Sequence, residues 1–110
     1  MPTEAQPTHY ASQDEHRISS IDFRGKLDSG EVLTGTPTVT EVTTTDLVIS
    51  NPQVSTGILT INGVDVPIGE AIQFKVDYAG GTATKKYTVK VVCDTDAGQT
   101  VAAQVYVVIN

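Results

Sequence analysis

Tryptophan is absent from this 110-residue sequence, cysteine and methionine occur once each, and aromatic residues make up only 5% of it. A single cysteine excludes a disulfide within the chain and a cysteine-rich metal site. With so few aromatic residues, a core has to be built mostly from Val, Ile, Leu and Ala, which indicates a thin, aliphatic sandwich core.

Long apolar runs are missing as well. No run approaches the roughly 20 residues that a membrane-spanning helix needs. The first residues, MPTEAQPTHY, lack the basic start and the apolar middle of a signal peptide. We therefore expect no membrane partner, and we expect synthesis in the cytoplasm.

Positive charge is scarce, because 7 Lys plus Arg stand against 13 Asp plus Glu, giving a formal net charge of -6. An acidic surface repels phosphate backbones, so we expect no nucleic acid among the partners. The length suits one domain with a single core.

The most informative stretch is residues 87–109, where two valine-rich runs are joined by a polar turn at residues 95–98. Such runs, with a turn that ends in glycine, predict an antiparallel hairpin. We expect it to be the central pair of a small sheet. Both faces of its last strand are apolar near the end, so the outward face, with Tyr106 and Val108, should meet a second surface. The inward residues of its first strand are Tyr87, Val89, Val91 and Cys93.

Two further segments have clear local patterns. Asn62 and Gly63 lie between apolar flanks and favour the type I′ turn of a tight hairpin. Residues 71–78 alternate with a period of two, which predicts a half-buried strand. The core-facing set is Ile72, Phe74, Val76 and Tyr78, and the water-facing set is Ala71, Gln73, Lys75 and Asp77.

The remaining expected strands are less regular. The first covers residues 18–23, and a threonine-rich strand contains Pro37, which restricts it to a sheet edge or Pro37 to the strand's first residue. A short strand over residues 46–50 is expected to end at the turn residues Asn51 and Pro52.

Together these patterns give about seven or eight short strands with turn signals roughly every 8 to 12 residues and no helical period, which is typical of an immunoglobulin-like sandwich. We predict an all-β fold, an immunoglobulin-like antiparallel β-sandwich, over residues 18–110. Tyr87 is a candidate for a tyrosine corner, in which the hydroxyl bonds to backbone upstream.

Residues 1–17 are polar, contain two prolines and have no hydrophobic period. We predict an extended N-terminal assembly arm that lies on a neighbouring subunit, and the alternative is an arm folded back on its own domain. The residues that we assign to the assembly interface are Tyr10, His16, Ile18, Tyr106 and Val108.

No set of side chains points to catalysis. Cys93 is expected inside the core as a small hydrophobe, with acidic neighbours that disfavour a thiolate. His9 and His16 have no periodic frame that would bring them together. The serines that lack a glycine elbow or an identifiable base are Ser12, Ser19 and Ser20.

Asp94, Asp96 and Gly98 have the spacing that opens a calcium loop, but Gly98 leads directly into a strand and no Glu follows, so we favour an ordinary hairpin turn. We therefore expect no metal, no cofactor and no enzyme activity. Two pairs are too short or wrongly placed to bind phosphate, namely Lys85 with Lys86 and Gly80 with Gly81.

Residues 80–100, GGTATKKYTVKVVCDTDAGQT, resemble the GGTAxxxYTVxxxxxTxxGxT signature of small immunoglobulin-like structural proteins of tailed bacteriophages. The similarity covers residues 14–110. Its N-terminal part consists of an acidic start at Asp14 and Glu15, a strand that ends in Asp22 and Phe23, and a segment with Leu27, Gly30 and Glu31.

This resemblance implies a non-enzymatic virion structural protein, made in the host cytoplasm, with other virion subunits as partners and a homo-oligomeric arrangement. We favour a neck or tail fibre adaptor that docks through its N-terminal arm, and the alternative is a capsid decoration (cement) protein on the head exterior. A hypothesis from another class is a carbohydrate-binding adhesion module that uses Tyr106. A bacterial adhesin fragment is disfavoured by the missing secretion signal.

Overall fold

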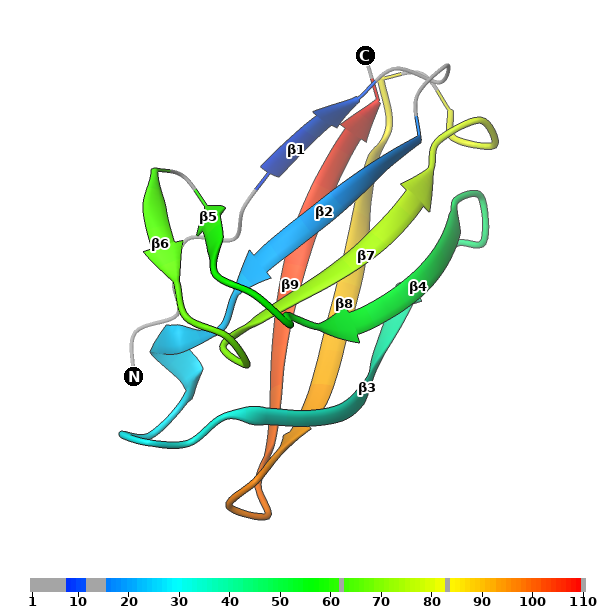
Figure 1. Ribbon diagram of the computed structural model, residues 1–110. Helices are drawn as coiled ribbons and strands as arrows, with labels where there is room; N and C mark the ends of the chain where they lie inside the picture. The colour runs from blue at the N-terminus through cyan, green and yellow to red at the C-terminus, as the bar shows by residue number, and fades with distance from the viewer. Residues whose placement is uncertain (1–7, 12–15, 62, 83, 110) are drawn as a thin grey trace.

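The structure, a computed structural model, describes residues 8–11, 16–61, 63–82 and 84–109 (Figure 1). Within these residues the chain forms nine strands and one short 3-10 helix. The strands are β1 (Thr8–Ala11), β2 (His16–Asp22), β3 (Leu33–Glu41), β4 (Val48–Val54), β5 (Leu59–Ile61), β6 (Val64–Val66), β7 (Ala71–Asp77), β8 (Lys86–Thr95) and β9 (Thr100–Ile109), and the helix η1 (Arg24–Lys26) follows β2.

The strands form two layers, with a small hairpin at the side (Figure 1). One sheet has the order β1-β9-β8-β3 and the other has the order β2-β7-β4, while β5 and β6 pair only with each other. Every pair is antiparallel except β1 with β9, which is parallel. The predicted all-β sandwich is confirmed.

The core lies between the two larger sheets. Its buried side chains come from β2 and β7 on one side and from β3, β8 and β9 on the other. Most are valine, isoleucine or tyrosine, and burying each one fully contributes roughly 1.5–3 kcal/mol of transfer free energy. The largest are Phe23, Ile72, Phe74, Tyr78, Tyr87 and Ile109.

The alternation predicted for residues 71–78 can be compared with the burial observed in and just after β7. The four side chains predicted to face the core are all at most 1% exposed. The prediction for Ala71 was wrong, because this side chain is buried as well. Ala71 pairs with Asp22, and the backbone N–H of Ser55 donates to its carbonyl, so neighbouring backbone encloses this end of the strand.

Both predicted hairpins are confirmed. Strands β8 and β9 are the central pair of the four-stranded sheet. In the β5–β6 hairpin, Ile61 pairs with Val64, so the loop has two residues, and Gly63 adopts a φ of 78°. Positive φ at this position matches the turn that the Asn-Gly pair favours. Asn62 itself lies outside the described residues.

Pro37 lies in β3, which is the edge strand of its sheet, as its missing N–H requires. The prediction that the next strand ends at Asn51 and Pro52 was wrong, because β4 continues through both residues to Val54. The register shifts between Ser50 and Gln53, and Asn51 has a φ of 52°. Asparagine tolerates this left-handed conformation, so the pair makes a β-bulge rather than a strand end.

The sandwich begins before residue 18. Residues 8–11, which the sequence assigned to the arm, form β1 and pair with β9 of the same chain from Thr8 opposite Tyr106 to Ala11 opposite Ile109. Strand β2 begins at His16 rather than at Ile18. In these residues the chain follows the alternative considered above, an N-terminal segment folded back on its own domain. Residues 1–7 and 12–15 lie outside the described residues.

Candidate assembly surface

The five residues assigned to an assembly interface fall on both sheets. Tyr10, Tyr106 and Val108 belong to β1 and β9, and Tyr10 pairs in register with Val108. His16 and Ile18 belong to β2 in the other sheet, where Ile18 is 68% exposed. The predicted set is therefore not one continuous patch. Its coherent part is the end of β9, at the edge where β1 pairs.

Tyr106 lies half-buried on the outward face of β9. The ammonium group of Lys86, on the neighbouring strand, lies 4.0 Å from the centre of its ring. This contact is within the range of a cation–π interaction. The face of the ring that Lys86 covers is therefore not free to stack on a sugar.

A hydrogen-bonded corner fixes the chain between β7 and β8. The Tyr87 hydroxyl accepts a hydrogen bond from the Thr82 backbone N–H at 2.7 Å and donates one to Asp46 Oδ2 at 2.7 Å. The bond to upstream backbone confirms the arrangement expected of a tyrosine corner. Lys85 adds a distant ion pair to Asp46, 3.9 Å between Nζ and Oδ2. This corner joins the loop before β4 to the start of β8.

Glycines 80 and 81 have packing roles at the same corner. A Cβ on Gly80 would lie 2.2 Å from the carbonyl oxygen of Asp46, which is closer than any real contact. A Cβ on Gly81 would lie 3.1 Å from Ile109 Cδ1. The Gly-Gly-Thr part of the phage-like signature therefore occupies positions where the fold itself needs these residues.

The acidic turn between β8 and β9 uses its carboxylates within the chain. Asp96 Oδ1 accepts a hydrogen bond from the Val32 N–H at 3.0 Å, and Asp94 Oδ1 accepts one from the Thr100 hydroxyl at 2.9 Å. Gly98 has a φ of 80°, as expected for the end of a hairpin turn. Among the described residues, no group of three or more His, Cys, Asp or Glu is placed to hold a metal ion.

Sequence reasoning missed two carboxylates that organise loops. Glu31 is buried, and it accepts hydrogen bonds from the Asp28 N–H and from the Thr95 hydroxyl. Glu41 accepts hydrogen bonds from the backbone N–H groups of Asp46 and Leu47. The only local signal was the turn-forming DSGE sequence at Glu31. Both carboxylates take the place of missing backbone acceptors, which is a structural role.

The remaining chemical candidates occupy ordinary positions. Cys93 is buried, and burial, together with the charge of Asp94, raises the pKa of its thiol despite hydrogen bonds to backbone carbonyls. Ser19 is buried, and Ser20 accepts a hydrogen bond from the Gln73 side chain at 3.2 Å. The other candidates are distributed as follows: His9 in β1, His16 in β2 and Ser12 outside the described residues.

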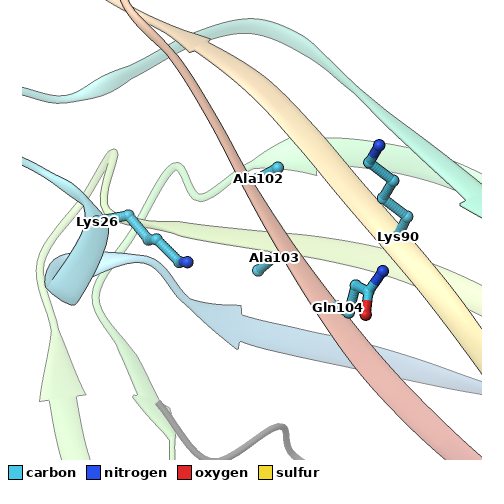
Figure 2. Close-up of a pocket in the computed structure, with 5 residues that line it drawn as sticks. All are labelled: Lys26, Lys90, Ala102, Ala103 and Gln104. Carbon is cyan, nitrogen blue, oxygen red and sulfur yellow. The ribbon is translucent and has the colours of Figure 1, made fainter. Parts of the chain in front are cut away.

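A shallow hollow on β8 and β9 was not foreseen (Figure 2). It has a volume of about 190 Å³ and is lined by Lys26, Lys90, Ala102, Ala103 and Gln104. Lys26 reaches toward β9 from η1, and Lys90 pairs directly with Gln104 across the two strands (Figure 2). Four of these residues belong to the predicted β8–β9 hairpin, but no sequence motif places Lys26 of η1 beside them.

The chain matches no model of a known protein family and no curated protein. Within the described residues, no helix has the length and apolar character needed to cross a membrane. A functional proposal therefore has to rest on the fold, on the end of β9 where β1 pairs, on the hollow, and on the resemblance seen in the sequence.

Proposed function

We propose that the sandwich is of the immunoglobulin-like type. In a constant-type immunoglobulin domain one sheet has the strand order A-B-E-D and the other has C-F-G. The order β2-β7-β4 corresponds to B-E-D, and β3-β8-β9 corresponds to C-F-G, with β1 added beside the last strand. The β5–β6 hairpin is then an insertion between the strands in positions D and E. The hydrogen bond between Thr82 and Tyr87 supports the same assignment.

We propose further that the protein is a non-enzymatic structural protein of a tailed bacteriophage virion. The resemblance of residues 80–100 to the phage signature motivates this function. The observation that carries it is the strand β1, which anchors the N-terminal segment at the edge of β9 beside Tyr106 and Val108. A partner that binds β1 therefore also meets the adjoining end of β9, which gives two adjoining contact areas.

The favoured role is a neck or tail fibre adaptor that docks through its N-terminal segment, with a capsid decoration protein as the alternative. In either role, each residue that becomes ordered on docking costs on the order of 1 kcal/mol, so the contact has to be extensive. In a homo-oligomer around the particle the same contact is repeated, and the resulting multivalency offsets this ordering cost. A stiff sandwich would hold two neighbouring virion subunits at a fixed distance and orientation.

A truncation tests this proposal. Deleting residues 1–7 leaves every described strand in place, so the variant should fold with an unchanged circular dichroism spectrum and thermal midpoint. We expect it to be missing from purified particles, while the full chain appears by cryo-electron microscopy at the neck or tail. Density over the capsid lattice would favour the decoration role. Full occupancy by the truncated chain would contradict docking through the N-terminal segment.

A further inference from the structure

The edge of β9 is only partly covered by another strand. Strand β1 pairs with residues Tyr106 to Ile109, whereas β9 begins at Thr100. Among the described residues, no strand lies beside residues 100–105 on the side away from β8. Unpaired backbone N–H and C=O groups of an edge are a template for a further strand.

The hollow of Figure 2 lies along this open part of β9. Ala102 and Ala103 lie on opposite faces of β9, with Ala103 packed against the core, and both side chains end at Cβ, so neither face is filled at this point of the strand. Gln104 and Lys90 are directly opposite one another, which places their side chains about 5 Å apart at Cβ. The hollow therefore combines an available backbone edge, two small side chains and three polar side chains from η1, β8 and β9.

Every polar side chain that lines the hollow can donate a hydrogen bond, and two of the three carry positive charge. Within the described part of the chain, neither Lys26 nor Lys90 makes an ion pair, whereas Arg24 pairs with Asp22 and Lys85 with Asp46. Two ammonium groups without an ion pair therefore line one hollow of a chain whose formal net charge is -6. Carboxylates are the groups that complement them.

We propose that the open edge of β9 is a docking site for an extended, acidic segment of a partner protein. The segment adds as a strand beside residues 100–105, in line with β1, and its carboxylates bind between Lys26 and Lys90. Backbone pairing gives affinity and the two lysines give specificity. The acidic remainder of the chain opposes this binding only weakly at physiological salt, because charges more than about 8–10 Å away are screened. That the partner is another virion subunit rests on the proposed function, but the site does not.

A titration of the isotope-labelled full chain with a short peptide of alternating Thr and Glu tests the site by nuclear magnetic resonance. We expect backbone shifts centred on residues 100–105 and side-chain shifts at Lys26, Lys90 and Gln104. The matched Thr-Gln peptide should give much smaller shifts. The double variant Lys26→Gln, Lys90→Gln should weaken binding on the order of tenfold. The control Lys75→Gln removes one ammonium group from β7 in the other sheet and should leave binding unchanged.

Three results would overturn the proposal. Equal binding of the Thr-Gln peptide would remove the carboxylate requirement. Equal shifts from inorganic phosphate alone would reduce the hollow to an unspecific anion site. Binding only after deletion of residues 1–7 would assign the edge to the chain's own N-terminal segment.

The peptide titration separates this site from the virion role. If the chain binds the peptide but never enters particles, the docking site is supported and the proposed virion function is contradicted. Incorporation into particles without peptide binding keeps the function and excludes the site.

Discussion

Removing the Tyr87 hydroxyl should measurably destabilise the sandwich. The side chain is 1% exposed, and its hydroxyl makes two hydrogen bonds of 2.7 Å, one of them to a carboxylate. A neutral hydrogen bond contributes about 1 kcal/mol net and one to a charged group somewhat more. Because the Asp46 carboxylate is partly exposed and can regain water, we expect Tyr87→Phe to cost about 2 kcal/mol in total.

Urea unfolding followed by circular dichroism measures this cost. A loss of about 2 kcal/mol should lower the unfolding midpoint by roughly 1 M urea with an unchanged slope, and lower Tm by roughly 8–10 °C. Tyr106→Phe is the matched control, because among the described residues its hydroxyl makes no hydrogen bond. It should change the free energy of unfolding by less than about 0.5 kcal/mol.

A double-mutant cycle with Asp46→Ala isolates the bond to the carboxylate. The coupling free energy between the two sites should be about 1 kcal/mol. If Tyr87→Phe costs as much in the Asp46→Ala background as in the native chain, the bond contributes nothing and the reasoning is refuted. Equal costs for Tyr87→Phe and Tyr106→Phe would refute it too.

Two further perturbations test separate features. Gly80→Ala places a Cβ 2.2 Å from a backbone oxygen, so it should lower the free energy of unfolding by about 1–3 kcal/mol, measured by calorimetry. In the control Gly57→Ala the new Cβ meets no atom within 4 Å, so this change should be nearly neutral. Equal losses for the two variants would contradict this account. Burial opposes ionisation of Asp22, yet the hydrogen bonds and charge of Arg24 leave its pKa below its ordinary value of 3.8, so its contribution to stability is present above about pH 4 and is lost as the pH falls further. Asp22→Asn should flatten the stability profile below pH 4, and an unchanged acid profile would exclude this contribution.

Local patterns predicted much of this fold. The alternation in β7 and the turn signals of the β5–β6 and β8–β9 hairpins involve residues close in sequence, so composition and period suffice to find them. The bulge at Asn51 was missed because a turn signal and a bulge use the same left-handed residue.

Local patterns could not predict the pairing of β1 with β9, nor could they predict the hollow. Strands β1 and β9 come from opposite ends of the sequence, and the four residues THYA carry no periodic signal for a parallel pair. Lys90 and Ala102 belong to the predicted β8–β9 hairpin, but Lys26 comes from η1, far away in the sequence. Each is ordinary alone, and only their proximity makes a candidate site. Tyr106 and Val108 were identified because apolar residues on both faces of one strand are visible in the sequence.

The parallel pairing of β1 and β9 also determines how the domain bears tension. Thr8, at the start of β1, lies opposite Tyr106, and Ala11 lies opposite Ile109 at the end of β9. A pull applied between Thr8 and Ile109 therefore drives the two strands past each other along their own axes. The bonds between them are sheared together rather than opened one after another. A subunit held at one terminus and loaded at the other would resist through this short pair before the core is stretched.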